Sequence, residues 1–394
     1  MTGPDPGGQP AGGQPAAGQP AAGQPAGPGR IRTPLTDLAG IACPIIQAAM
    51  GYVSGARLAA ATSQAGGLGM VASATMSLEE LRSAIKSVQE RTAAPFGVNL
   101  RADTADAGER IAIIIGERVP VASFALAPRP ELIGRLRDAG VITIASVGAR
   151  RHAEKVAAWG IDAVIATGGE GGGHTGSVPT SLLIPQLVDA VDVPVIAAGG
   201  YFDGRGLVAA LAYGAAGIAM GTRFLLTSDS PVAEAVKQAY LASDVTGTVV
   251  TSKVDGVPHR VLRTPLTERL DRAGRLSGLI RSARSAAGFR GESGLGWPEL
   301  IRAGRAMRSG SELSWAQVLM AANTPALLRA AMVDGRPDLG LMSSGQVAGL
   351  ISDLPSCAEL IERIMTEAGM CLARLPDPGR LPDPSGHGGV EQVS

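Results

Sequence analysis

The chain has 394 residues, of which 45% are hydrophobic, 18% are charged and 3% are aromatic, and its formal net charge is zero. This length predicts one large domain with an appendage or two domains, and the neutral charge gives no indication of a nucleic-acid partner. The three cysteines, Cys43, Cys357 and Cys371, have no metal-ligand spacing, and so small and odd a number favours a reducing, cytoplasmic location over a disulfide framework.

Both ends of the chain have a composition typical of disorder. Residues 1–29 repeat Gly-Gln-Pro-Ala with small variations, and residues 376–394 are again rich in proline and glycine. Such segments have little apolar surface to bury, so we expect two disordered tails. The sequence has neither a basic segment followed by an apolar one at its start nor a long uncharged apolar run, so we expect no signal peptide and no membrane span.

Residues 30–241 predict eight strand–helix units. The expected strands are Pro44–Met50, Gly67–Ser73, Phe96–Leu100, Val121–Leu126, Val141–Val147, Ala163–Gly168, Pro194–Gly199 and Gly217–Thr222. The expected helices are Ala56–Ala65, Ser77–Arg91, Thr104–Gly116, Arg129–Ala139, Ala149–Trp159, Ser181–Ala190, Gly204–Tyr213 and Pro231–Leu241. Strands that are apolar on both faces are typical of a parallel sheet covered by helices. Eight evenly spaced units favour an α/β fold of the closed (β/α)8 barrel type over an open, doubly wound sheet.

Residues 242–375 break this rhythm. A polar, basic stretch at 253–290 precedes helix-like segments at Trp297–Arg308, Trp315–Met320 and Ala358–Leu375. We therefore expect a smaller, mainly helical subdomain that covers the barrel mouth.

The functional site of a barrel lies at the C-terminal ends of its strands. Most residues expected there are small, which leaves room for a large, flat ligand. The pairs Gly199–Gly200 and Gly221–Thr222 end the seventh and eighth strands, where backbone N–H groups commonly hold a phosphate. Alternatively, these glycines only allow tight turns.

The loop after the sixth strand, Gly168–Gly176, has six glycines among its nine residues. It contains a G-x-G-x-x-G match, but the strand that follows lacks the terminal acidic residue of a dinucleotide fold. His174 is the one histidine expected at the barrel mouth, where an imidazole can act as a general base. The alternative is a histidine that only hydrogen-bonds a cofactor or a loop carbonyl. Glu170 is either an acid of the site or a carboxylate that orients the loop.

Other chemistries have little support in the sequence. His152 lies in an expected helix, His259 in a polar stretch and His387 in the C-terminal tail. No second metal ligand stands at a suitable spacing on the glycine-rich loop, and no G-x-S-x-G nucleophile motif occurs.

Six motifs occur in the order PIIQAAM, GGLGMVAS, FGVNL, GGEGGGHTG, PVIAAGG and AMGTRF, and together they span most of Thr33–Ser230. This set resembles the nitronate monooxygenase family, once called 2-nitropropane dioxygenases. A later segment, SGQVAGL at Ser344–Leu350, matches as well. The resemblance implies a TIM barrel that binds FMN non-covalently.

The resemblance also implies a role for individual residues, with His174 as the catalytic base. The expected flavin-ring and ribityl contacts are Ala48, Ala49, Met50, Asn99, Gly172 and Gly173. The expected phosphate contacts are Gly199, Gly200, Gly221 and Thr222, and Gln346 would close the site. Thr167 is also expected beside the cofactor, but it replaces a glutamine of many family members, and Gly171 replaces an alanine.

Two reactions follow from the resemblance. In the first and main expectation, His174 removes the acidic α-proton of a nitroalkane, or the enzyme takes up a nitronate directly. The flavin accepts the electrons and is reoxidised by O2. In the second, the substrate is a CoA thioester of steroid-ring breakdown, oxidised or reduced α,β to its carbonyl with O2 or NAD(P)H as redox partner. The segments SFALAP, FDGRG and TSDS look closest to the actinobacterial subgroup that performs this second reaction.

A basic cluster bears on the choice of substrate. It would either bind the phosphates of CoA or form a solvated surface, and it consists of Arg260, Arg263, Arg269, Arg272 and Arg275. A barrel that binds a phosphate ligand without turnover is the non-enzymatic alternative.

Overall fold

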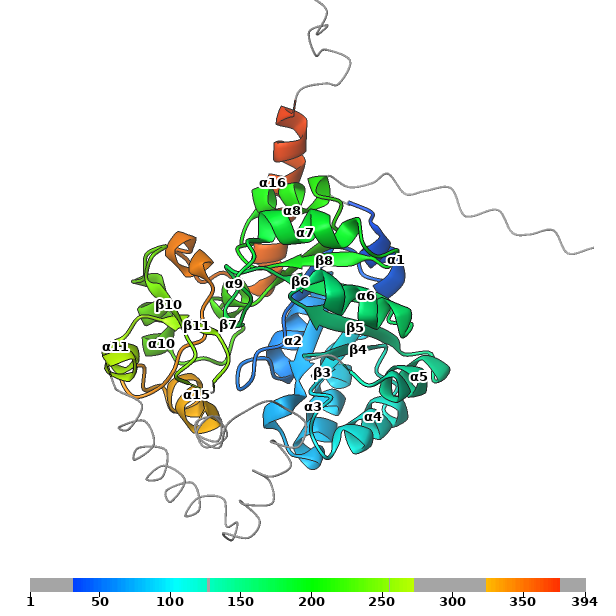
Figure 1. Cartoon of the computed structure of the whole chain (residues 1–394), viewed down its shortest axis with the longest axis horizontal. Helices are drawn as coiled ribbons and strands as arrows, with labels where there is room; N and C mark the ends of the chain where they lie inside the picture. The colour runs from blue at the N-terminus through cyan, green and yellow to red at the C-terminus, as the bar shows by residue number, and fades with distance from the viewer. Residues whose placement is uncertain (1–30, 126–127, 255, 273–323, 376–394) are drawn as a thin grey trace, which may run out of the picture.

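The computed structural model describes residues 31–125, 128–254, 256–272 and 324–375. The two tails and the helices expected at Trp297–Arg308 and Trp315–Met320 lie outside these ranges. Within them, eight parallel strands form one sheet in the order β1-β9-β8-β6-β5-β4-β3-β2 (Figure 1). The strands are β1 (Ile45–Gln47), β2 (Gly69–Ala72), β3 (Phe96–Leu100), β4 (Val121–Phe124), β5 (Ile142–Val147), β6 (Ala163–Thr167), β8 (Val195–Ala198) and β9 (Gly217–Met220).

The first and last strands of this order meet and close the sheet. A parallel bridge joins Ile46 to Leu68, and the Leu68 N–H donates to the carbonyl oxygen of Ile45 at 2.9 Å. The predicted (β/α)8 barrel is therefore confirmed. The strands are shorter than expected because several of the apolar residues at their ends belong to the loops of the mouth.

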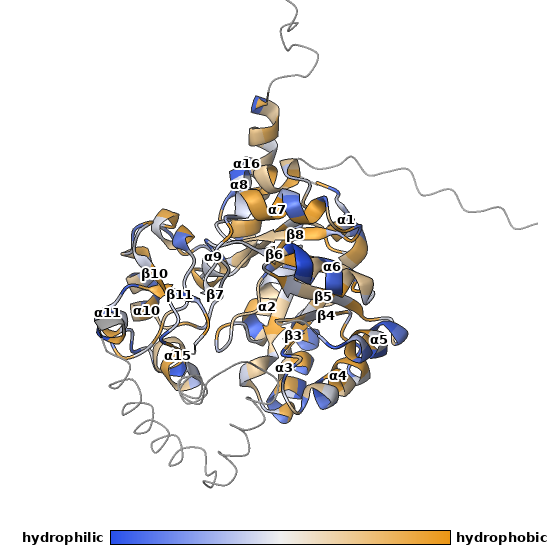
Figure 2. Ribbon diagram, viewed as in Figure 1, coloured by the Kyte–Doolittle hydropathy of each residue, from blue (hydrophilic) through white to orange (hydrophobic). Residues whose placement is uncertain are grey.

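Apolar runs without alternation produce two layers of core. Ile46, Met70 and Ile196 belong to one buried cluster, whereas their neighbours Ile45 and Val71 belong to another. Since successive side chains of a strand point to opposite faces, the first cluster fills the barrel and the second packs under the helices. Figure 2 shows the apolar strands at the centre and the polar surfaces of the helices outside.

Seven of the surrounding helices lie where the sequence predicts them: α2 (Ala56–Gln64), α3 (Leu78–Arg91), α4 (Ala107–Gly116), α5 (Pro130–Asp138), α6 (Arg150–Ala158), α7 (Thr180–Val188) and α8 (Gly204–Ala212). A further short helix, α1 (Pro34–Ala39), contributes Leu35 and Ala39 to the core inside the barrel. No helix among the described residues is long and apolar enough to cross a membrane.

The eighth helix position differs from the expectation. The helix expected at Pro231–Leu241 is α10 (Glu234–Leu241), which contacts the 3-10 helix η2 (Gln346–Leu350). Instead α16 (Cys357–Arg374) packs against both α8 and α2 and so completes the ring (Figure 1). The fit is close, because a Cβ added at Gly204 would lie 2.3 Å from the Ala368 nitrogen.

A small antiparallel sheet lies beside the barrel mouth. Its strands, in the order β10-β11-β7, are β10 (Thr248–Thr251), β11 (His259–Leu262) and β7 (Gly173–His174). Figure 1 shows this sheet grouped with α10, α11 (Pro265–Arg272) and α15 (Thr324–Met332) on one side of the barrel. The short α9 (Thr222–Leu225) and the 3-10 helix η1 (Ser73–Thr75) complete the described elements. The division at residue 241 into barrel and subdomain stays a prediction.

Candidate active site

The turn after β1 is held by two buried side chains. Gln47 donates from Nε2 to the Ser54 hydroxyl at 2.8 Å and accepts from the Met70 N–H at 3.1 Å. The Ser54 hydroxyl in turn accepts from the Met50 N–H at 2.9 Å. These bonds present Ala48–Met50, which are half-buried, at the mouth. Gln47 and Ser54 were not among the residues expected at the site, although a glutamine inside an otherwise apolar strand is a visible signal.

Asn99 is the penultimate residue of β3, and both its side chain and its backbone carbonyl are hydrogen-bonded. Its Nδ2 donates to the Ser123 hydroxyl at 2.8 Å, and its carbonyl oxygen accepts from the Ser73 hydroxyl at 2.7 Å. The side-chain oxygen of Asn99 is thus the atom that remains to accept a hydrogen bond from a ligand. Asn99 and Ala48–Met50 lie on the same rim as the sequence predicts.

The glycines expected to hold a phosphate are brought together on adjacent strands. Gly199 and Gly200 follow β8 with φ angles of 103° and 83°, a region that favours glycine. Gly221 and Thr222 follow β9, which pairs with β8. The backbone N–H groups of Gly200, Gly221 and Thr222 donate to no acceptor among the residues that the structure describes.

Glu170 orients the glycine-rich loop. Its carboxylate accepts from the Thr180 N–H at 2.9 Å and from the Thr180 hydroxyl at 2.6 Å, at the N-terminus of α7. The same hydroxyl lies 3.1 Å from the carbonyl oxygen of Gly199. Of the two expectations for Glu170, these bonds favour the loop-orienting carboxylate.

The segment that contains Gly345 and Gln346 packs against this glycine-rich loop. The N–H of Gln346 donates to the carbonyl oxygen of Glu170 at 3.0 Å, and the N–H of Gly345 donates to the Thr222 hydroxyl at 3.0 Å. A Cβ at Gly172 would lie 2.5 Å from the Gly345 nitrogen, so this close approach requires glycine. Gln346 therefore reaches the mouth, as expected.

Thr167 ends β6 beneath the same loop and is half-buried. A Cβ at Gly171 would lie 3.1 Å from the Thr167 methyl carbon, so the two departures from the family pattern are in contact. A side chain at position 171 would therefore require the Thr167 methyl group to shift slightly.

His174 is exposed. It lies in the short strand β7, whereas the sequence predicts a loop at this position. β7 pairs with β11 so that His174 stands opposite His259. The two rings have centroids 4.8 Å apart and an interplanar angle of 55°. His259 is only 3% exposed, and its Nε2 lies 2.8 Å from the Ser343 hydroxyl. No local sequence pattern indicates this contact between two histidines that are far apart in the chain.

Arg260 contacts the glycine-rich loop, a role that the sequence did not suggest. Its guanidinium donates to the carbonyl oxygen of Gly169 at 2.8 Å and to the Thr248 hydroxyl at 2.9 Å. Burial lowers its pKa from the ordinary arginine value. These bonds assign Arg260 a role in holding the glycine-rich loop, and the expectation that the basic cluster binds the phosphates of CoA stays a prediction. Arg263 and Arg269 are exposed, whereas the Arg272 side chain and Arg275 lie outside the described part.

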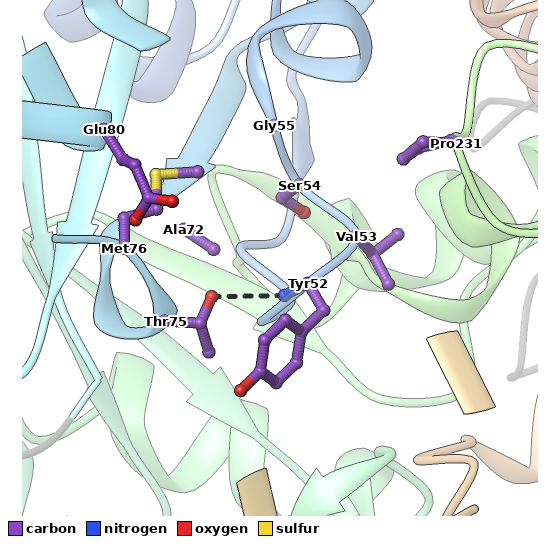
Figure 3. A pocket seen from close by; sticks show the side chains of 9 residues that line it. All are labelled: Tyr52, Val53, Ser54, Gly55, Ala72, Thr75, Met76, Glu80 and Pro231. Carbon is purple, nitrogen blue, oxygen red and sulfur yellow. Dashed lines mark hydrogen bonds between the residues drawn. The ribbon is translucent and has the colours of Figure 1, made fainter. Parts of the chain in front are cut away.

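A cavity of about 230 Å³ opens next to the turn that follows β1 (Figure 3). Tyr52, which lines it, has a φ angle of 64°, and its N–H donates to the Thr75 hydroxyl at 3.3 Å. Burial raises the pKa of the Tyr52 phenol, and the charge of Arg329 opposes this effect. The lining residues are Tyr52, Val53, Ser54, Gly55, Ala72, Thr75, Met76, Glu80 and Pro231.

Comparison with known proteins agrees with this geometry. The family model described as nitronate monooxygenase matches residues 32–113 and 107–367. FabK from Thermotoga maritima superposes with a TM-score of 0.71 at 34% identity, over 87% of this chain and 98% of that one.

Two curated relatives are more similar in sequence, and both are named (3aS,4S,5R,7aS)-5-hydroxy-7a-methyl-1-oxo-octahydro-1H-indene-4-carboxyl-CoA dehydrogenase. The protein from Mycobacterium tuberculosis is 60% identical over 342 residues, which is 86% of this chain and 96% of the relative. The protein from Rhodococcus jostii is 55% identical over 338 residues, which is again 86% of this chain and 96% of the relative. The chain is thus an oxidoreductase, and it belongs to the nitronate monooxygenase family.

Proposed function

We propose that this chain is an FMN-dependent dehydrogenase of a CoA thioester whose acyl group is a hydroxylated, bicyclic indene carboxylate. The observation that carries the proposal is one exposed imidazole, His174, at a glycine-lined barrel mouth, in a chain that shares more than half of its aligned residues with two dehydrogenases of this name. Nitronate oxidation, the main expectation from the sequence, is supported by the family as a whole rather than by these two relatives. The CoA thioester is therefore the better-supported substrate.

The residues at the mouth fit FMN. Gly200, Gly221 and Thr222 offer backbone N–H groups to a phosphate, and no Cβ at Gly200 stands in its way. The half-buried Ala48–Met50 turn and the Asn99 amide would bind the flavin ring, with Thr167, Gly172, Gly173, Gly199 and Gln346 around it. When bound there, FMN would supply the acceptor for two electrons.

The imidazole of His174 would take a proton from the carbon next to the thioester carbonyl, which acidifies that C–H bond. The hydrogen on the adjacent carbon would leave with its electron pair, so a carbon–carbon double bond forms. Arg260 and Glu170 would keep the glycine-rich loop in place, because Arg260 donates to the carbonyl oxygen of Gly169 in the loop and Glu170 fastens the loop to Thr180. Neither is placed to exchange a proton with the substrate.

The cavity around Tyr52 is the region proposed to receive part of the acyl group. It borders the turn that contains Met50, and its walls include apolar groups of Val53, Ala72 and Met76. An apolar ring system gains free energy by leaving water for such a surface. The phosphates of CoA would have to bind outside this cavity. Arg263 and Arg269 are exposed members of the basic cluster that the sequence offers for this role.

The test is anaerobic mixing of the FMN-loaded protein with the indene-carboxyl-CoA thioester or with a nitronate, while the flavin absorbance is followed. Fast bleaching by the thioester and slow bleaching by the nitronate is the expected result. The reverse order would overturn the proposal in favour of nitronate oxidation. Protein that binds no FMN would remove the flavin premise.

A further inference from the structure

The exposed imidazole of His174 packs against the buried imidazole of His259. The antiparallel pairing of β7 with β11 places His174 opposite His259, and their ring centroids are 4.8 Å apart. His174 faces solvent, whereas His259 is 3% exposed. The orientation of the exposed ring is therefore limited on one side by a ring that is itself held in the protein.

His259 is anchored through a short chain of contacts to a helix. Its Nε2 lies 2.8 Å from the Ser343 hydroxyl, and the carbonyl oxygen of Ser343 accepts from the Tyr240 hydroxyl at 2.7 Å. Tyr240 is fully buried in α10. A backbone bridge between Val261 and Ser343 joins β11 to the same segment. These contacts connect His259 to the segment around Ser343 and, through it, to α10.

A general base at a barrel mouth needs such a constraint. Exposed side chains change rotamer on the picosecond to nanosecond timescale, and a shift of about 1 Å in a reacting group can lower the rate about 100-fold. β7 has only two residues, so the backbone alone gives His174 little support. The ring of His259 packs against it, with the ring centroids 4.8 Å apart.

We propose that His259 is a positioning residue that orients His174 for proton transfer and that Ser343 holds His259 in place. The proposal rests on the proposed function, because it takes His174 as the group that accepts the proton. It adds that the chemistry depends on a second histidine which does not touch the substrate. A purely structural role in the small sheet is the competing explanation.

The two explanations differ in how His259 couples to His174. A residue that acts only through His174 has no further effect on turnover once His174 is removed, whereas a structural residue lowers turnover by the same factor in both backgrounds. The experiment is a double-mutant cycle that uses His259→Gln, which keeps an amide for Ser343, and His174→Ala. The measured quantity is the anaerobic rate of flavin reduction at saturating thioester.

We expect His259→Gln to lower this rate about 10- to 100-fold, with KM within about twofold of wild type. In the His174→Ala background it should change the remaining rate by less than about twofold. His259→Phe keeps a ring against His174 and should recover part of the loss. Equal losses in both backgrounds, or a wild-type rate for His259→Gln, would overturn the proposal.

Two controls keep the result interpretable. If His259→Gln does not fold, Ser343→Ala removes only the hydroxyl beside His259 and is expected to lower the rate in the same His174-dependent way. An unchanged rate for Ser343→Ala then contradicts the proposal. If wild-type protein is not reduced by the thioester but is reduced by a nitronate, the proposed substrate is wrong, and the same cycle with the nitronate still decides the role of His259.

Discussion

The carboxylate of Glu170 accepts a hydrogen bond from the backbone N–H of Thr180 at 2.9 Å, so the glycine-rich loop is fastened to the first turn of the helix that follows it. The carbonyl oxygen of the same glutamate accepts from Gln346. Glu170 thus joins the barrel to the later segment that reaches the mouth.

Glu170→Ala is expected to weaken FMN binding about 10-fold, because a hydrogen bond to a charged group contributes about 1.5–3 kcal/mol. The rate per bound flavin should change less, since Glu170 is not placed at the reacting atoms. Titration of the apoprotein with FMN, followed by flavin fluorescence, measures the affinity. Glu154→Ala, on the exposed face of α6, is the matched control and should bind FMN normally. Equal affinity in both variants would contradict the assigned role.

Gly172→Ala should separate the loop from the Ser344–Gln346 segment, because the new Cβ would lie 2.5 Å from the Gly345 nitrogen. We expect a lower melting temperature and weaker FMN binding. Gly134→Ala in α5 meets nothing within 4 Å, and it should be neutral or stabilise the helix by up to about 1 kcal/mol. Thermal unfolding of both variants with and without FMN tests this contrast.

His174→Ala should lower turnover at saturating substrate about 100-fold or more, the usual contribution of a general base. FMN content should stay near that of wild type, because the His174 side chain is exposed. His152→Ala, in an exposed position of α6, serves as the control. Turnover of His174→Ala within a few-fold of wild type would remove His174 from the mechanism.

The carboxyl group of Asp353 is expected to make a pH-dependent contribution to the free energy of unfolding. Hydrogen bonds from Arg363 and then Arg223 lower the pKa of its carboxyl group below the ordinary value. A lowered folded-state pKa stabilises the protein above the unfolded pKa of about 3.9, and this stabilisation is lost as the pH falls through the folded value. Arg223 is 2% exposed and would lose a charged partner, so Asp353→Asn should cost about 1–2 kcal/mol at pH 7.

The difference in the free energy of unfolding between Asp353→Asn and wild type should shrink as the pH falls below about 4. Urea unfolding at pH 7 and in acid measures it. Asp103→Asn removes an exposed pair with Arg101 and should change stability by less than about 1 kcal/mol. A deficit for Asp353→Asn that does not depend on pH would exclude the electrostatic explanation.

Local sequence was sufficient for the barrel and for the rim of the site. Apolar runs of strand length placed eight strands, and their ends placed Asn99, Gly199 and Gly221 at one edge. Local sequence could not identify the eighth helix, because α10 and α16 both have helical patterns and only packing against α2 decides between them. It also missed β7, since two residues in a glycine-rich loop become a strand only by pairing with β11.

The roles of polar side chains were the least predictable part of the site. Arg260 lies in a basic stretch, and its bond to Gly169 connects residues that are far apart in the chain. His259 could be recognised beside His174 only once the register of β7 and β11 was known. Both assignments depend on tertiary pairing, which single-sequence patterns do not report.

The place of α16 in the helix ring affects how the chain is made. Residues 221–356 separate it from the last barrel strand, so all eight strands leave the ribosome well before this helix. Until residues 357–374 emerge, the faces of α2 and α8 that α16 covers remain open to water and to other chains. A chain truncated before residue 357 would therefore lack one helix of the ring around the barrel rather than a tail.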